Sequence, residues 1–189
     1  TNASITGFAG TGINLNSIDA VVLTNTTSSQ NGKGLNATTI TSFSDTDGLY
    51  NGNVDGGIML TGVTGEVDLT RTEASDNDSD SNNVGTGFAA DTVGGKVTIL
   101  GSTFDGGGTA PQENGVTLNA ITGDITIGDS GAFSTSISGN TGAGLEVTNS
   151  ATSNVSLTNV TADNNGGNGI SLTDVADVDF TGVSASSSG

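Results

Sequence analysis

The sequence has no cysteine, no histidine, no tryptophan, one proline and only three basic residues, Lys33, Arg71 and Lys96. Without cysteine, disulfides contribute nothing to stability. Twenty acidic residues face the three basic ones, for a formal net charge of −17. Three cations cannot neutralise a phosphate backbone, so nucleic acid is excluded as a partner. An anionic membrane surface would repel the chain for the same reason.

Long apolar segments and bulky side chains are also scarce. No apolar run approaches the roughly 20 residues that a membrane helix needs, so membrane insertion is not expected. Neither a signal peptide nor an initiating methionine is present, and we expect a mature product or an excised fragment. Hydrophobic residues make up 32% and aromatic residues 4% of the chain, too few for a conventional core of large side chains.

Glycine, asparagine, threonine, serine and aspartate dominate instead, with 31 glycines among 189 residues. Gly, Asn and Asp tolerate the left-handed backbone of tight turns, whereas all five residue types are mediocre or poor in helix interiors. The composition therefore predicts many short strands joined by tight turns.

A glycine followed by an apolar residue opens each unit of an internal repeat. Successive openings are 22, 23, 30, 28, 29 and 25 residues apart, and they are Gly12-Ile13, Gly34-Leu35, Gly57-Ile58, Gly87-Phe88, Gly115-Val116, Gly144-Leu145 and Gly169-Ile170. A second apolar pair follows in most units: Val21-x-Leu23, Val67-x-Leu69, Val97-x-Ile99, Ile125-x-Ile127, Val155-x-Leu157 and Val178-x-Phe180. Such alternation is typical of half-buried strands.

The start of the chain resembles this second pair. Ile5-Thr6-Gly7-Phe8 matches Leu23-Thr24-Asn25-Thr26 and Leu69-Thr70-Arg71-Thr72, so we expect residues 1–11 to be the end of a preceding coil. The second unit, with Leu35, Ala37, Ile40 and Phe43, is irregular and its register is uncertain. The longest units add residues at 75–84, 106–114 and 130–141, which are predicted to be loops projecting from one edge.

One unit cannot bury its apolar face, but stacked units can. The sequence therefore predicts an all-β fold: one domain over residues 1–189, a single-stranded parallel β-helix (solenoid) of about seven coils with 22–30 residues each. At about 4.8 Å per coil the stack would be roughly 34 Å long.

These glycine-apolar openings, Asn-Gly turns and coil lengths resemble right-handed parallel β-helix proteins. The Asn/Thr/Gly/Asp-rich, cysteine-free composition is similar to that of repetitive bacterial surface proteins and adhesins. The resemblance implies a right-handed coil, the hand that parallel crossovers also prefer. It further implies an extracellular or cell-surface location on a bacterium.

Outward carboxylates are the first candidate site, because β-helix folds often process polysaccharides. The candidates are Asp68, Asp124, Asp174, Asp177 and Asp179. Two carboxyl groups about 5 to 9 Å apart could hydrolyse a glycoside. However, the glycosidases of this fold use His beside Asp, and the lyases use Ca²⁺ with Arg or Lys, whereas here the only arginine is Arg71. A solvated acidic face is the alternative interpretation.

The segment Asp76-Asn77-Asp78-Ser79-Asp80 alternates acidic oxygens that suit a hard cation. Asp76, Asp78 and Asp80 are therefore a candidate weak calcium site, although the glycine and distal glutamate of an EF-hand are missing. An extended polar loop is the alternative. Gly166 to Leu172 resembles a calcium-binding nonapeptide repeat, but Ser171 stands where that repeat needs Asp, which favours a plain turn.

Three further features have a functional and a structural interpretation. The Asn-Gly pairs at Asn31, Asn51, Asn114 and Asn165 could bind sugars, but stacked turn amides that bond along the axis are the favoured interpretation. Thr98 and Thr126 could belong to an ice-binding face, but their column also carries Val22, Asp68, Ser156 and Asp179. Tyr50, in the irregular second coil, could lie on the surface as a sugar-stacking platform.

Three functions remain open at this point. The first is a non-catalytic structural segment of an extracellular bacterial surface or fibre protein, a rigid rod or adhesive stalk that meets neighbouring subunits or further coils end to end. The second is an adhesin that binds glycans or a host partner through the loops at 75–84, 106–114 and 130–141. The third is a polysaccharide-processing or tailspike-like enzyme. Apart from Ca²⁺, no cofactor is expected.

Overall fold

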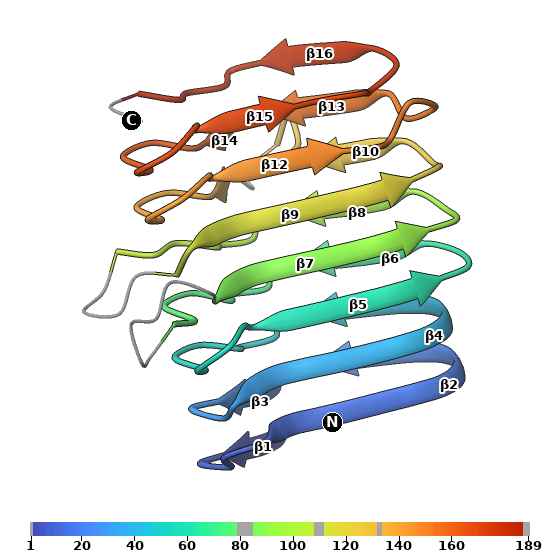
Figure 1. Ribbon diagram of the computed structural model, residues 1–189, viewed down its shortest axis with the longest axis vertical. Helices are drawn as coiled ribbons and strands as arrows, with labels where there is room; N and C mark the ends of the chain where they lie inside the picture. The colour runs from blue at the N-terminus through green and yellow to red at the C-terminus, as the bar shows by residue number, and fades with distance from the viewer. Residues whose placement is uncertain (1, 79–84, 108–111, 132–133, 187–189) are drawn as a thin grey trace.

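The computed structural model describes residues 2–78, 85–107, 112–131 and 134–186, and in these ranges the chain forms strands and turns without a helix (Figure 1). The strands are β1 (Ala3–Thr6), β2 (Thr11–Thr24), β3 (Thr26–Ser29), β4 (Lys33–Thr46), β5 (Ile58–Val63), β6 (Val67–Thr70), β7 (Thr86–Val93), β8 (Val97–Leu100), β9 (Asn114–Ile121), β10 (Ile125–Ile127), β11 (Thr135–Ser136), β12 (Leu145–Thr148), β13 (Val155–Thr158), β14 (Val160–Thr161), β15 (Ile170–Leu172) and β16 (Val178–Thr181). The predicted all-β solenoid of about seven turns is confirmed.

Each coil has three faces, and like faces stack in parallel. The first face holds the start of β2 and of β4, then β5, β7, β9, β12 and β15, and the second holds the ends of β2 and β4, then β6, β8, β10, β13 and β16. The third face holds β1, β3, β11 and β14, joined through single bridges at positions such as Leu49, Glu73 and Thr103. In Figure 1 the chain crosses the front from left to right, returns behind and rises, which makes the coil right-handed.

The register confirms the glycine-apolar repeat. The first apolar residue of each unit forms one column along the axis: Ile13, Leu35, Ile58, Phe88, Val116, Leu145 and Ile170. The second apolar pair of each unit stacks in the same way on the second face. Between the two end coils, stacking buries these residues, because each inward side chain lies between equivalent ones in the coils above and below.

The irregular second coil follows the same register. Leu35 pairs with Ile13 and Ile58, and Phe43 pairs with Val21 and Val67. Asp45 lies two residues after Phe43 and pairs with Leu23 and Leu69 in an otherwise apolar column. The second apolar pair of the repeat is hard to recognise in this coil because a carboxylic acid occupies one of its interior positions.

The interpretation of the opening residues as a second strand is wrong. β1 pairs with β3 on the third face, and Ile5 lies beside Ser28 rather than in the column of Leu23. The motif Ile5-Thr6-Gly7-Phe8 matches the second strand only because both strands end at a turn with a left-handed residue, Gly7 in one and Asn25 in the other.

The three loops predicted at 75–84, 106–114 and 130–141 lie partly outside the described residues, so their projection from one edge stays a prediction. The described residues 75–78 and 106–107 follow the third face, after the bridge positions Glu73 and Thr103. The segment 130–141 includes β11 of the third face, so its first residues leave the corner between the second and third faces.

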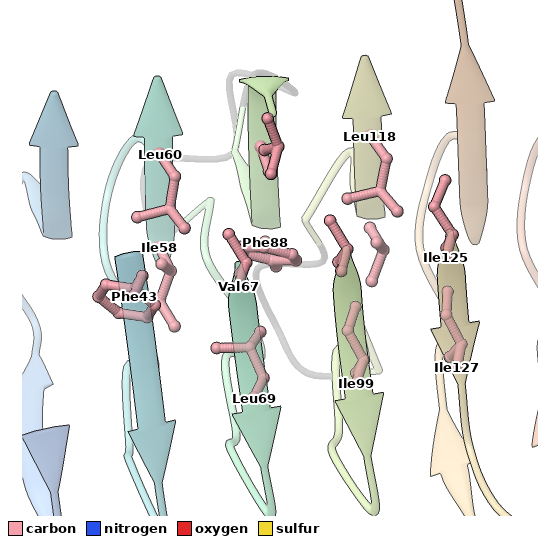
Figure 2. Close-up of a cluster of buried hydrophobic side chains, with 14 of the residues drawn as sticks. Phe43, Ile58, Leu60, Val67, Leu69, Phe88, Ile99, Leu118, Ile125 and Ile127 are labelled. Carbon is pink, nitrogen blue, oxygen red and sulfur yellow. The ribbon is translucent and has the colours of Figure 1, made fainter. Parts of the chain in front are cut away.

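The core consists of buried side chains from all three faces. Figure 2 shows Phe43, Val67 and Leu69 of the second face meeting Ile58, Leu60 and Phe88 of the first face between the strands. The third face adds Phe104, whose ring centroid is 6.1 Å from that of Phe88. Columns of Val, Ile and Leu side chains fill the interior between them, so the core of the described residues needs few buried aromatic side chains, namely Phe43, Tyr50, Phe88 and Phe104.

The corners depend on single residues in the left-handed conformation. Between the first and second faces these are Ser17, Thr39, Gly62, Thr92, Ala120, Asn149 and Asp174. Between the second and third they are Asn25, Asp47, Arg71, Gly101, Gly128, Asn159 and Gly182, and after the third they are Gly7, Gln30, Gly52, Asp76, Gly139 and Asn164. One residue in this conformation switches which side of the backbone faces the interior. The strands of two neighbouring faces can therefore be joined with hardly any loop.

Thr92 is strained at its corner, because a β-branched side chain disfavours its φ of 61°. We expect Thr92→Asn to raise the free energy of unfolding by about 1 kcal/mol, since Asn149 already fits the same column. Urea unfolding followed by circular dichroism measures the change. Thr98→Asn, the same replacement inside β8, should be neutral or destabilising because Asn is unfavourable in strands; equal effects at both positions would contradict the strain argument.

Candidate functional site

A row of buried carboxamides lies inside the corner that follows the third face. Its members are Asn31, Asn53, Asn77, Gln112, Asn140 and Asn165, all at most 2% exposed. The backbone N–H of Asn31 donates to Oδ1 of Asn53 (2.9 Å), and that of Asn53 donates to Oδ1 of Asn77 (3.1 Å). The same bond joins Asn140 to Asn165 (3.0 Å). We call this row the inner amide ladder.

The side-chain nitrogens of the inner amide ladder satisfy main-chain carbonyls. Nδ2 of Asn53 donates to the Ser28 carbonyl (3.2 Å) and Nδ2 of Asn165 to the Ala162 carbonyl (2.9 Å). The ladder is interrupted at the coil that carries Gln112 in place of Asn: Oδ1 of Asn140 is buried and has no hydrogen-bond partner. Elsewhere each amide fixes both the corner of its own coil and the distance to the next coil.

The glycines that open the repeat face this ladder. A Cβ on Gly57 would lie 2.5 Å from the Gly87 carbonyl oxygen and 2.8 Å from Nδ2 of Asn77. A Cβ on Gly144 would lie 2.5 Å from the Gly169 oxygen and 2.6 Å from Nδ2 of Asn165. These glycines have no left-handed φ, so they are required for space rather than for conformation.

A second ladder runs along the outside of the same corner with the opposite polarity. Oγ of Ser29 accepts the backbone N–H of Asn51 (3.1 Å), and Oδ1 of Asn51 accepts that of Ser75 (2.8 Å). The series continues through Asp105, Ser138 and Asp163 to the N–H of Ser186. We call this row the outer ladder. Each side chain accepts from the next coil, whereas in the inner ladder each accepts from the preceding coil.

Asp163 shows the electrostatic effect of the outer ladder. Its Oδ1 accepts the N–H of Ser186 (2.6 Å) and the hydroxyl of Ser184 (2.8 Å), and these bonds hold the pKa of the carboxyl below its usual value. A depressed pKa stabilises the fold above the ordinary pKa of an aspartate. That contribution is lost as the pH falls through the folded-state pKa.

The favoured interpretation of the Asn-Gly pairs, turn amides that bond along the axis, is correct for all four, and two of them belong to the inner amide ladder. Asn31 and Asn165 belong to the inner amide ladder. Asn51 belongs to the outer ladder, and Oδ1 of Asn114 accepts the N–H of Ala143 in the next coil (2.8 Å). The sequence signal missed Asn53, Asn77 and Asn140, since none of them precedes a glycine.

The candidate carboxylates are spread along the solenoid. Asp68 and Asp179 share an outward column of the second face, but Thr98, Thr126 and Ser156 separate them. Four coil spacings of about 4.8 Å put them roughly 19 Å apart, too far for paired acid–base work. Asp174 is a left-handed corner residue.

Asp124 and Asp177 lie in a polar column at the corner before the second face. Asn154 stands between them and donates to Oδ1 of Asp124 (2.9 Å), while Lys96 lies 3.7 Å from Glu66 in the same column. Asp177 and Asp179 are neighbours on the exposed outside of the last coil, alternating with Val178, which faces the interior. This arrangement is a solvated polar surface without a surrounding cleft.

The candidate calcium site falls partly outside the described residues, because Asp80 is not among them. Asp76 is a half-buried corner residue and the Asp78 side chain is buried. Among the residues that the structure describes, no group of three or more acidic side chains could hold a metal ion. Calcium binding at Asp76, Asp78 and Asp80 therefore stays a prediction.

The outward column that contains Thr98 and Thr126 is not uniform, which argues against an ice-binding face. Val22, Ser44, Asp68, Thr98, Thr126, Ser156 and Asp179 are in register along it. The adjacent outward column holds Thr24, Thr46, Thr70, Thr158 and Thr181 but is interrupted by Leu100. A charge in one column and an apolar side chain in the other break the uniform array that such a face needs.

The prediction that Tyr50 could lie on the surface is wrong. Tyr50 is fully buried, and its hydroxyl donates to Oδ1 of Asp45 (3.0 Å). Oδ2 of Asp45 accepts the hydroxyl of Thr72 from the next coil (2.6 Å). A Cβ on Gly48 would lie 2.1 Å from this carboxylate, so the absence of a side chain at Gly48 makes room for the pair.

Both ends of the stack expose the interior columns. A cavity at the C-terminal end is lined by Ile170, Leu172, Val178, Phe180 and Val183, and Phe180 is 50% exposed. At the other end Ile13, Leu15 and Leu23 pack against the core on one side only. In the middle of the stack, the equivalent side chains lie between two coils.

Comparison of the chain with protein-family models, with characterised proteins and with solved structures finds no match. The described part of the chain contains no helix with the length and apolarity to cross a membrane. The stack itself has two opposed polar ladders, a core that runs along its length and apolar columns exposed at its ends.

Proposed function

We propose that this chain is a non-catalytic structural segment of an extracellular bacterial surface or fibre protein, serving as a rigid rod or adhesive stalk. The observation that carries the proposal is the outer ladder, which joins seven successive coils through the same side-chain position from Ser29 to Ser186. Together with the inner amide ladder and the strand pairing, it links each coil to the next at the corner as well as along the faces.

The charge distribution supports a passive surface. Two of the three basic side chains are in exposed ion pairs with carboxylates of an adjacent coil, Arg71 with Asp47 (2.6 Å) and Lys96 with Glu66 (3.7 Å). These pairs and the stacked Asn and Thr side chains connect neighbouring coils and leave the sides of the rod acidic. Net negative charge keeps such rods soluble and separates them side by side.

The open ends supply the contacts of a rod. Apolar columns and unpaired strand edges at both ends favour further strands in line with the axis. In this proposal further coils or neighbouring subunits cover the ends, while the acidic sides remain solvated.

We expect the isolated chain to associate end to end as its concentration rises. Phe180→Asp places a charge in the terminal interior column and should weaken association at least about tenfold, a change of about 1.4 kcal/mol. Sedimentation velocity gives the dissociation constant, and negative-stain images show whether the particles lengthen. Val22→Asp, on the side of the first coil, is the matched control and should leave association unchanged. A wild-type chain that stays monomeric at high concentration, or equal effects of the two variants, would contradict the proposal.

A further inference from the structure

Asp45 is the one acidic residue inside the apolar columns of the described part of the chain. Its neighbours along the axis are Leu23 and Leu69, and its side chain is fully buried. The other acidic side chains of the paired strands, such as Asp68 and Asp91, point outward. A carboxylic acid at this position must be explained by what surrounds it, since burying a charge without a counter-charge is unfavourable.

Hydroxyl and amide groups, rather than basic side chains, surround the Asp45 carboxyl. Tyr50 donates from the same coil, Thr72 donates from the next coil, and the backbone of Gly48 also bonds to it. The titratable or charged groups nearest to it are Tyr50 and Asp47, and Asp47 faces outward in its ion pair with Arg71. The carboxyl is therefore hydrogen-bonded but lacks a cation.

These surroundings favour the neutral acid. Burial is the dominant cause that raises the pKa of Asp45, and the like charge of Asp47 adds to it, against the hydrogen bonds that lower it. A raised pKa stabilises the fold fully below the pKa of an unfolded aspartate, near 3.8. That contribution is lost as the pH rises through the folded-state pKa, because the folded protein must then hold a buried anion.

The first two coils bear this destabilisation. The inward side chains of the first coil have a partner on one side only, and Val21 is the single hydrophobic residue of β2 that is fully buried. In a stack each coil contacts only its neighbours, so a loss of stability in the second coil loosens the end before it affects the middle.

We propose that the Asp45–Tyr50–Thr72 cluster makes residues 2–55 a pH-responsive end of the solenoid. With Asp45 protonated, the first two coils are held on the third. With Asp45 ionised, they open locally while the coils from Ile58 onward remain closed. The proposal concerns this end alone and holds whether or not the chain serves as a structural rod.

Hydrogen exchange measured by mass spectrometry tests the proposal, with rates corrected for the intrinsic effect of pH, from below the pKa of an unfolded aspartate, at about pH 3.5, to about pH 9. In the wild type, the protection of peptides from 13–46 should fall by at least about tenfold as the pH rises, while that of peptides from 86–107 stays constant. Asp45→Asn keeps an acceptor for the Tyr50 hydroxyl and a donor toward Thr72. In this variant the exchange protection of peptides from 13–46 should therefore be high and independent of pH.

Two further variants separate the cluster from general charge effects. Asp68→Asn removes an outward, half-buried carboxylate from the adjacent coil and should preserve the wild-type profile. Tyr50→Phe removes one donor to the carboxylate and should move the loss of protection to higher pH, which also serves as the test if Asp45→Asn fails to fold. A wild-type profile without pH dependence, the same profile in Asp45→Asn, or an unshifted profile in Tyr50→Phe would overturn the proposal.

Discussion

Gly115→Ala should lower the free energy of unfolding by at least about 3 kcal/mol, because there is no space for a methyl group at this position. The added Cβ would lie 2.2 Å from Cγ2 of Ile137, 2.8 Å from the Gly144 carbonyl oxygen and 2.9 Å from Nδ2 of Asn140. Cγ2 of Ile137 belongs to the third face and Nδ2 of Asn140 to the inner amide ladder. Relief of the clash would therefore disrupt both the face and the ladder. Urea unfolding followed by circular dichroism measures the loss.

Gly107→Ala is the matched control for this substitution. Gly107 lies in the preceding coil and has no left-handed φ, and a Cβ built on it has no atom of the described residues within 4 Å. Its replacement should change the free energy of unfolding by less than about 0.5 kcal/mol. If Gly115→Ala were as mild as Gly107→Ala, the glycines of the repeat would not be required for space.

Asn53→Ala should lower the free energy of unfolding by about 3 kcal/mol, because it removes one member of the inner amide ladder. The backbone N–H of Asn31 loses its acceptor at 2.9 Å, and the Ser28 carbonyl loses its donor at 3.2 Å. Both groups are buried, where water cannot replace the lost bonds. The midpoint of urea unfolding should fall accordingly, and exchange of the Asn31 amide hydrogen should become faster.

Asn36→Ala provides the comparison in the same part of the stack. Nδ2 of Asn36 donates to Oδ1 of Asn14 in the coil below (3.0 Å), but this pair is exposed. Water can satisfy both groups after the substitution, so the loss should be under about 1 kcal/mol. Equal losses at Asn36 and Asn53 would show that burial of the ladder is not what makes it stabilising.

The apolar columns of the first and second faces could be predicted from the sequence because their signal is periodic. Ile13, Leu35 and Ile58 stack as the spacing of the glycine-apolar openings indicates. A side chain that alternates inward and outward in every coil must stack on its equivalent in the next, and no alternative register buries the same residues.

The third face could not be predicted with the same certainty. Its inward positions hold Thr26, Gly48, Thr72 and Ser102, followed by Tyr50, Ala74 and Phe104 in the adjacent column. Polar and small residues at inward positions carry no hydrophobic period, so the pattern that identifies a strand is absent. For this reason Ile5 was assigned to the wrong face and Tyr50 to the surface.

By itself the sequence determined the class of fold, the number of coils and the register of two faces, because these follow from the spacing of apolar residues. Only the tertiary structure decided why the glycines are there, which amides form the inner ladder, and that Asp45 lies in the core. Each of these depends on atoms 22 to 35 residues apart in the chain, such as Asn53 beside Asn77 and Asn77 beside Gln112. Short-range patterns of residue type do not contain such contacts, since they arise when coils of unequal length stack.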